Sequence, residues 1–268
     1  MQKRVPSDGH RHSPIRLPRM RSGDSPRWRY EINLHQGAQP ESAANSPDEG
    51  GGLIVAEIAH VDETGLPEAI RLMQGALDNA GVVIFPTETV YGLAARADML
   101  GAVEHIYQIK ERPSSNPLPV MVGSKARVYD ITIGLDERFE RLAEYFWPGP
   151  LTMVLPKNTV IDTTVTAGRR SVAVRIPSHE VALGLLRALP LPLAVTSANI
   201  SAEETPNEEE MIAYFTDKVD VIILGETNRY HQPSTIVDLT SRNPQIIRHG
   251  AIERERIEAA LQGLCEIR

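Results

Sequence analysis

The sequence predicts an α/β domain built around a mixed β-sheet. Helical and strand patterns alternate from Leu53 onward, as they do where strands are joined through covering helices. Some neighbouring strand patterns have no helix between them, which is typical of antiparallel neighbours. With 268 residues, of which 41% are hydrophobic, the chain is long enough to bury one sizeable core.

Helices are predicted where apolar residues recur every three or four positions. In the first helix Ile70, Met73 and Leu77 fall on one face, and Gly81 follows as a stop signal. Asp98 is expected to cap the second helix. The predicted helices cover residues 67–79, 98–109, 124–129, 136–146, 179–188, 207–215 and 252–261.

Strands are predicted in short apolar runs that are bounded by glycine, proline or polar turn residues. The run at 82–85 is apolar throughout, which indicates a strand buried on both faces. The Trp-Pro-Gly-Pro stretch at 147–150 is a turn before the strand that follows it. The predicted strands cover residues 82–85, 118–122, 151–155, 171–176, 193–196, 219–224, 235–239 and 246–247.

Residues 1–52 differ in composition from the domain predicted at 53–268. They contain eight basic and six acidic residues, scattered prolines and serines, and few aliphatic side chains. Such a segment buries too little apolar surface to offset its ordering entropy, so we expect a disordered extension. A plain extension, a misassigned start codon, an organellar transit peptide and a basic tail that aids RNA encounter all remain open.

Composition also excludes several classes of protein. The formal net charge of -7 argues against a general nucleic-acid coat, and the single Cys265 excludes an internal disulfide framework. The single cysteine favours a cytoplasmic protein. No apolar stretch is long enough to span a bilayer, so no membrane contact is expected. The histidines lack metal-ligand spacing, and neither a P-loop, a G-x-G-x-x-G turn nor a G-x-S-x-G elbow is present.

Five sets of polar side chains lie at the predicted ends of strands or helices, where open α/β sheets bind ligands. Hydroxyls, amides and guanidinium groups at such positions suit a small polar or phosphorylated ligand. The sets are Thr87, Glu88, Thr89 and Tyr91; Lys110, Arg112 and Asn116; Ser171 and Arg175; Thr196, Ser197 and Asn199; and Ser234, Thr235 and Arg248.

Three of the sets also have a purely structural interpretation. The first could be turn formers that cap a helix, the second could compensate a helix dipole, and the fourth could be an asparagine turn. In the third, alternation puts Ser171, Ala173 and Arg175 on one face of a strand. An arginine at such a position needs an anionic partner or solvent.

The order of these sets resembles the YrdC/Sua5 family, the threonylcarbamoyl-AMP synthases. The resemblance rests on Pro-Thr-Glu-Thr-Val-Tyr-Gly-Leu at 86–93, Lys-x-Arg-Pro at 110–113 and Asn-Pro-Leu at 116–118. It continues with Thr-Ser-Ala-Asn at 196–199 and Ser-Thr-Ile-Val-Asp at 234–238. Further blocks lie at 147–152, 173–179 and 247–248. The resemblance implies a single YrdC-like domain, a twisted mixed sheet with flanking helices and a concave, locally positive ligand groove.

The resemblance also implies a reaction, in which L-threonine, bicarbonate and ATP give L-threonylcarbamoyl-AMP and pyrophosphate. This is the first step toward N6-threonylcarbamoyladenosine at position 37 of tRNA, so a downstream tRNA threonylcarbamoyl-transfer machinery is implied as partner. Mg2+ would accompany ATP, with no organic cofactor. By resemblance, Lys110 and Arg112 would be catalytic, and Thr89, Tyr91, Arg175 and Ser197 would bind threonine. The expected nucleotide-binding residues are Arg112, Asn116, Ser171, Asn199, Asn207, Ser234 and Arg248.

Some positions depart from the family pattern. Many members have histidine where this chain has Met121, and a thioether cannot replace the hydrogen bond of an imidazole. Ala202 replaces a common glycine, Asn207 stands near a common threonine, and His249 replaces a frequent proline. The chain ends at Arg268 without the linker and second domain of the longer Sua5 type, so the single-domain form is expected.

Two alternatives to the synthase remain, and Met121 is the reason for the first of them. One is a paralogue with the same fold that performs other carbamoyl-adenylate chemistry. The other is a non-catalytic module whose groove, with Lys110 and Arg112, contacts tRNA or double-stranded RNA. Binding of RNA would weaken steeply with salt, whereas a synthase would be stabilised by ATP and threonine.

Overall fold

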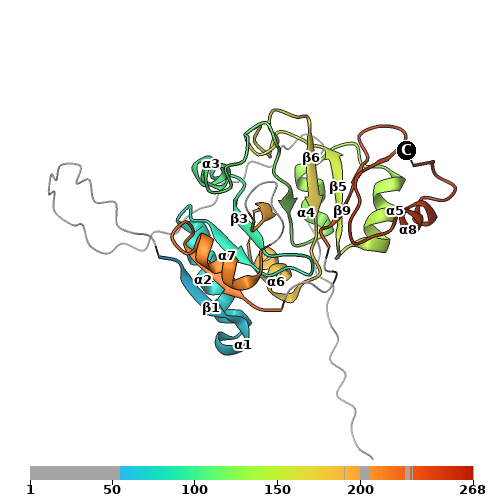
Figure 1. The fold of residues 1–268 in the computed structure, drawn as a ribbon. Coiled ribbons are helices and arrows are strands. Elements are labelled where there is room, and N and C mark those ends of the chain that lie inside the picture. Colours follow the sequence, from blue (N-terminus) through green and yellow to red (C-terminus); the bar gives the residue numbers. More distant parts are fainter. Residues whose placement is uncertain (1–54, 190, 200–205, 227–229, 231, 268) are drawn as a thin grey trace, which may run out of the picture. The chain divides into compact units, whose positions relative to one another are not determined.

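The sheet has ten strands in the order β1-β8-β2-β3-β7-β4-β6-β5-β9-β10 (Figure 1). The structure is a computed structural model that describes residues 55–189, 191–199, 206–226, 230 and 232–267. The expectations about residues 1–52 therefore lie outside the described residues. The strands are β1 (Glu57–His60), β2 (Val83–Phe85), β3 (Gly92–Arg96), β4 (Val120–Met121), β5 (Leu151–Pro156), β6 (Ser171–Arg175), β7 (Leu193–Ser197), β8 (Val221–Leu224), β9 (Thr235–Asp238) and β10 (Gln245–Arg248).

The sheet is mixed, as the sequence predicts. Strands β1 and β2 run parallel to β8, β4 runs parallel to β6, and β5 runs parallel to β9. The hairpin β2–β3 and the pairs β3–β7, β4–β7, β5–β6 and β9–β10 are antiparallel. Strands β1 and β3 were not predicted from the sequence. Strand β3 reads Gly-Leu-Ala-Ala-Arg and lacks the β-branched residues that mark strands.

Seven helices of the described residues are close to their predicted ranges, whereas α1 (Val61–Thr64) was not predicted. The seven are α2 (Leu66–Asp78), α3 (Leu100–Ile109), α4 (Lys125–Ile131), α5 (Glu137–Phe146), α6 (Glu180–Ala188), α7 (Glu208–Phe215) and α8 (Arg254–Ala260). The proposed cap of α3 was wrong: its N-cap is Met99, and Asp98 instead pairs with Arg96 at 2.9 Å. A competing salt bridge therefore takes the carboxylate away from the helix terminus.

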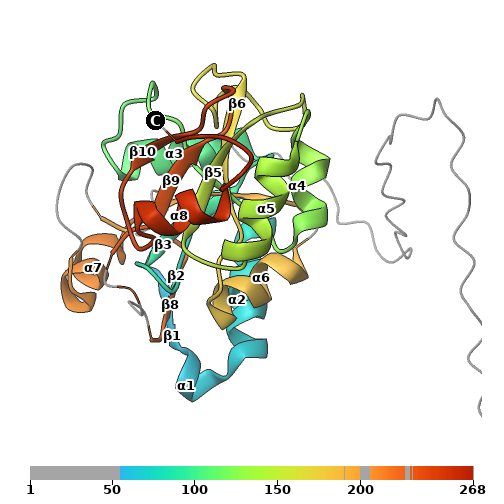
Figure 2. The same cartoon turned by 90° about the vertical axis from the view of Figure 1, so that its right-hand side faces the viewer.

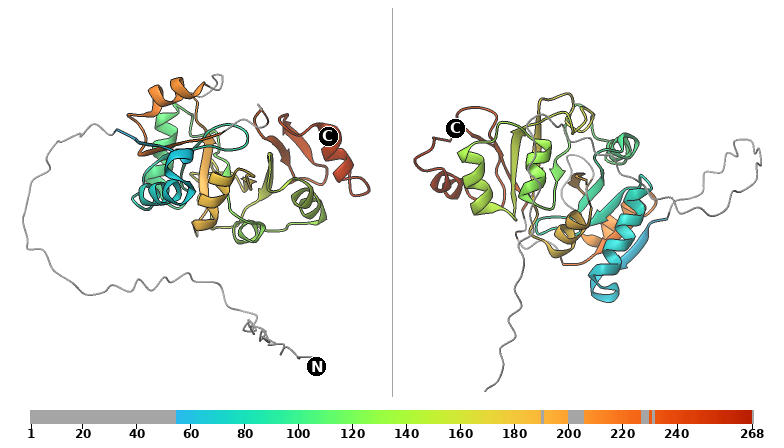
Figure 3. Two further views of the ribbon diagram at one scale, coloured as in Figure 1. Left: turned by 90° about the horizontal axis from the view of Figure 1, so that it is seen from below. Right: turned by 180° about the vertical axis from the view of Figure 1, so that it is seen from behind.

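Alternate residues of β2 enter different hydrophobic clusters, so both faces of this strand are covered. Val83 and Phe85 pack with α2 and α6, which lie side by side (Figure 2). Ile84 packs with residues of α3 and α7 on the other face. At the C-terminal end α8 lies against α5 (Figure 3), where the Arg256 guanidinium is 5.6 Å from the centre of the Phe146 ring.

The face that α2 and α6 cover continues as the wall of a cavity beyond β4. Met121 on β4 pairs with Arg175 on β6, and Val154 on β5 pairs with Ala173 on β6. These side chains line the cavity together with Asp238 on β9. The residues that alternate with them along the strands, such as Val174, belong to the core. The cavity thus lies over a stretch of the sheet that helices leave open.

None of the helices in the described part of the chain has the length and apolar character needed to cross a membrane.

Candidate active site

The cavity has a volume of about 590 Å3, within the range of small-ligand sites. Its wall carries four arginines, Arg112, Arg169, Arg175 and Arg248. Asp238 is the one carboxylate on the wall among the described residues. The remaining polar groups are hydroxyls and amides, so the cavity suits an anionic ligand.

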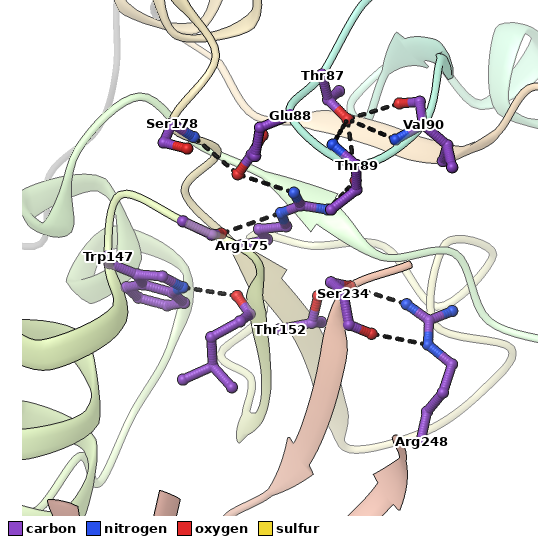
Figure 4. Close-up of polar contacts among 12 residues, drawn as sticks. Thr87, Glu88, Thr89, Val90, Trp147, Thr152, Arg175, Ser178, Ser234 and Arg248 are labelled. Atoms are coloured by element: carbon purple, nitrogen blue, oxygen red, sulfur yellow. Dashed lines mark hydrogen bonds and ion pairs between the residues drawn. The ribbon is translucent and has the colours of Figure 1, made fainter. Parts of the chain in front are cut away.

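The turn from Thr87 to Tyr91 forms one side of the cavity, where buried β2 ends. The Thr87 hydroxyl donates to the Val90 carbonyl at 2.6 Å and accepts from the Thr89 amide at 3.2 Å. This closed turn joins β2 to β3, so the interpretation as a helix cap was wrong. It fixes the backbone of Thr89, whose side chain faces the cavity (Figure 4).

Arg175 has the anionic partner that its place in a strand requires. Its Nη2 lies 2.9 Å from Glu88 Oε1, a charge contact rather than an aligned hydrogen bond, and both side chains are buried (Figure 4). The guanidinium also donates to Thr89 Oγ1 at 3.0 Å and to the Gly149 carbonyl at 3.2 Å. Burial opposes ionisation of Glu88, but Arg175 and the Ser178 amide lower the pKa of this carboxyl below its ordinary value.

Lys110 follows α3 but does not serve the helix carbonyls. Its side chain is 1% exposed, and Nζ donates to the Ser197 carbonyl and to Asn199 Oδ1, both at 2.7 Å. Ser197 Oγ also donates to Asn199 Oδ1, at 2.6 Å. Burial, and secondarily the charge of Arg112, lowers the pKa of Lys110 to about 8. Lys110 therefore holds Ser197 and Asn199 in place from behind the cavity wall.

Arg112 and Arg248 are held by carbonyl and hydroxyl oxygens. Arg112 donates to the carbonyls of Asn116 and Pro117, at 3.2 and 3.0 Å. Arg248 donates to the Ser234 carbonyl and hydroxyl at 2.9 and 2.8 Å (Figure 4). Burial lowers the pKa of both guanidinium groups. Because no carboxylate of the described residues neutralises either group, both charges are available to a ligand.

Tyr91 connects the cavity wall to α7. Its hydroxyl donates to Glu208 Oε2 at 2.5 Å and to the Gly225 carbonyl at 3.0 Å. Burial, together with the Glu208 carboxylate, raises the pKa of Tyr91. Asn207, just before Glu208, accepts the Glu210 amide at 2.9 Å and thereby caps α7.

Most of the residues selected from the sequence are brought together on the cavity wall. Of the twelve residues to which the resemblance assigns a role, ten line it: Thr89, Tyr91, Arg112, Asn116, Ser171, Arg175, Ser197, Asn199, Ser234 and Arg248. Lys110 and Asn207 do not, since one lies behind the wall and the other caps α7. Met121 also lines the cavity, and sequence analysis did not select Arg169 or Ile247 for the site. The described residues contain no group of three or more histidine, cysteine or acidic side chains suited to a metal.

A β-bulge explains why Ile247 was missed. Ile246 pairs with Val237 and Arg248 pairs with Ile236, so Ile247 is the extra residue. Bulges re-aim side chains and disturb simple alternation, which is the signal that sequence analysis uses. Both Ile247 and Arg248 therefore reach the cavity.

Comparison with known proteins gives a consistent result. The family model Sua5_yciO_yrdC, described as telomere recombination, matches residues 75–250. The chain is 41% identical over 193 residues to the threonylcarbamoyl-AMP synthase of Pyrococcus abyssi, covering 72% of this chain and 57% of that protein. It is also 41% identical over 182 residues to the Bacillus subtilis protein of the same name, covering 67% and 53%. This chain thus spans about half the length of these relatives.

A solved structure agrees in fold. The structure of P. abyssi Sua5 complexed with L-threonine superposes with a TM-score of 0.71 at 37% identity. The match covers 80% of this chain and 62% of that one. The family-model match extends over the blocks at 86–93, 110–118 and 196–199, which carry the residues of the cavity wall. The chain belongs to the Sua5/YciO/YrdC family.

Proposed function

We propose that this protein is an L-threonylcarbamoyladenylate synthase, a nucleotidyltransferase that joins L-threonine, bicarbonate and ATP with release of pyrophosphate. The observation that carries the proposal is the cavity itself. Among the residues that the structure describes, Arg112 and Arg248 have no carboxylate partner there and Arg175 has one. The names of the two relatives and the L-threonine in the Sua5 structure support this reaction.

The chemistry needs positioning and charge neutralisation more than a protein nucleophile. The threonine amine captures CO2 or bicarbonate, an oxygen of the resulting carbamate attacks the α-phosphorus, and pyrophosphate leaves. Negative charge on the phosphates is what the site must stabilise. Fixed guanidinium groups do so without reorganising during the reaction.

Two ends of the cavity take the two substrates in this proposal. The threonine end has Arg175 for the carboxylate, Thr89 and Ser197 as further contacts, and Tyr91 to shape the wall. The nucleotide end has phosphate-binding guanidinium groups supported by hydroxyls and amides. Its residues are Arg112, Asn116, Ser171, Asn199, Ser234 and Arg248.

Lys110 and Asn207 act through other residues. Lys110 fixes the Ser197 backbone and the Asn199 side chain, and it places a positive charge behind the wall. Asn207 fixes the start of α7, whose Glu208 holds Tyr91. We expect Mg2+ to enter with ATP as part of the substrate, bound to phosphate oxygens and water.

The test is pyrophosphate release by the purified full chain with Mg-ATP and bicarbonate, with and without L-threonine. Threonine-dependent release, with threonylcarbamoyl-AMP identified by mass spectrometry, is expected, and L-serine is the control substrate. Pyrophosphate release that does not depend on threonine would point to the paralogue with other carbamoyl-adenylate chemistry. Met121 on the cavity wall is the reason to consider this paralogue. Salt-sensitive RNA binding without turnover would point to the RNA-binding module.

The product would be consumed in the cytoplasm by a machinery that transfers the threonylcarbamoyl group to tRNA. A mixed phosphoric–carbamic anhydride is an activated acyl donor, so a second enzyme must accept it. The experiment is a coupled assay in which the purified protein, a tRNA and the transfer machinery are combined. Formation of modified adenosine only when this protein is present is the expected result.

A further inference from the structure

Arg169 is the arginine of the cavity wall that the site described above does not use. Its side chain is exposed, and it makes no hydrogen bond or ion pair with the described residues. The other three wall arginines are all engaged: Arg112 and Arg248 with carbonyl or hydroxyl oxygens, and Arg175 with Glu88. Arg169 therefore brings a positive charge with free donors to the cavity.

The backbone that presents Arg169 is fixed by its own loop. The Arg169 amide donates to the Thr166 carbonyl at 3.0 Å, and the buried Thr166 hydroxyl donates back to the Arg169 carbonyl at 3.2 Å. The Gly168 amide donates to the Thr163 carbonyl at 2.9 Å, and its φ of 75° suits glycine. The position of Arg169 is thus set by a folded turn.

This loop is also tied to the segment that carries Arg112. The Leu118 amide donates to the Val165 carbonyl at 2.9 Å. The Tyr107 hydroxyl contacts the carbonyls of both segments, at 3.1 Å for Asn116 and 3.3 Å for Thr164. Arg112 and Arg169 consequently belong to two connected loops that face one cavity.

The charge of the cavity indicates what Arg169 binds. Glu88 compensates Arg175, and Asp238 is the one carboxylate that lines the cavity in the described part of the chain. The uncompensated cations are then Arg112, Arg169 and Arg248. A polyphosphate has the charge to engage all three, whereas one carboxylate does not.

We propose that Arg169 binds the β- and γ-phosphates of the nucleotide and the pyrophosphate that leaves. The inference rests on the proposed function, and it adds a positioning residue for the leaving group. In the step concerned, the bond between the α-phosphorus and the bridging oxygen breaks. The electron pair goes to pyrophosphate, and Arg169 stabilises the charge that develops there.

The experiment uses Arg169→Ala in the full chain, with Arg170→Ala as matched control. Arg170 is adjacent, exposed and equal in charge, but it does not line the cavity. We expect Arg169→Ala to raise the KM for Mg-ATP and the inhibition constant of pyrophosphate, each about five- to tenfold. The KM for threonine should stay constant, Arg169→Lys should restore part of the loss, and Arg170→Ala should behave like the wild type.

A binding measurement separates this inference from the proposed function. Calorimetry with inorganic pyrophosphate needs no turnover, and AMP serves as the control ligand without a β-phosphate. Weaker pyrophosphate binding by Arg169→Ala with unchanged AMP binding supports the assignment even if the wild type releases no pyrophosphate from ATP. Three outcomes would overturn the assignment of Arg169. Arg169→Ala and Arg170→Ala could weaken pyrophosphate binding equally, neither could weaken it, or the loss could be confined to tRNA binding.

Discussion

The buried ammonium of Lys110 makes the stability of this protein depend on pH in a way that can be calculated. Burial lowers the pKa of Lys110 from 10.5 to about 8 in the folded protein. Between these two pH values the unfolded chain binds the proton and the folded chain releases it. The stability contributed by Lys110 is therefore fully present above pH 10.5 and is lost as pH falls through about 8.

The size of the effect follows from the two pKa values. Each pH unit corresponds to about 1.4 kcal/mol, so the difference between 10.5 and about 8 amounts to about 3 kcal/mol. Little of this is screened by solvent, because the side chain is 1% exposed. The two hydrogen bonds to Ser197 and Asn199 persist with a neutral amine, which still has two N–H donors.

The assay compares the wild type with Lys110→Met by urea unfolding at several pH values from about 7 to about 10.5. Methionine keeps the length of the side chain and removes the titrating group. The free energy of unfolding of the wild type, minus that of the variant, should rise by about 3 kcal/mol across this range. Groups common to both proteins cancel in this difference.

Lys125→Met is the matched control, since Lys125 is exposed and its pKa is raised by the hydrogen bond with Glu140. The free energy of unfolding of the wild type, minus that of Lys125→Met, should stay nearly constant over the same pH range. A flat difference for Lys110→Met as well would refute the reasoning, because it would mean that folding does not perturb this amine. Turnover should also fall as pH rises through about 8, if the positive charge behind the wall takes part in phosphate binding.

Three further substitutions test the site and its supports. Arg112→Ala should lower kcat at least ~10²-fold, because a guanidinium contact with phosphate strengthens in the transition state, whereas exposed Arg187→Ala should leave it unchanged in the pyrophosphate assay. Glu88→Gln should cost about 3 kcal/mol in urea unfolding, because it leaves the Arg175 charge buried without its partner. Asn207→Ala should cost about 1 kcal/mol by the same method through loss of the α7 cap, and Asn207→Ser should restore most of it.

Much of the sheet could be predicted because its strands are short apolar runs with clear ends. Strands β2, β7 and β8 follow from such runs, and the mixed topology follows from the missing helices between some of the runs. Strand β3 could not be predicted in the same way. It is held by pairing with β2 and β7, and tertiary pairing overrides the weak strand propensity of glycine and alanine.

The site was predictable as a set of residue types but not as a set of contacts. Alternation put Ser171 and Arg175 on one face of a strand and implied a partner for Arg175. That this partner is Glu88 depends on the arrangement of β6 beside the turn after β2, which no local pattern contains. Likewise, Lys110 shows in the sequence only as a cation near a helix end, and its burial behind Ser197 is a tertiary feature.

The different environments of the arginines would let one cavity accept the two unlike substrates of the proposed reaction. Arg175 has Glu88 beside it, so this end is close to neutral before a ligand binds. A free amino acid is itself neutral overall, and its carboxylate can contact Arg175 while Glu88 limits the attraction for more highly charged anions. Arg112 and Arg248 are held only by carbonyl and hydroxyl oxygens, which orient a guanidinium without cancelling its charge. A polyphosphate would therefore be drawn to Arg112 and Arg248 and disfavoured beside Arg175 and Glu88. Each partner group of an arginine sets both the direction of its guanidinium and the charge that remains for a ligand.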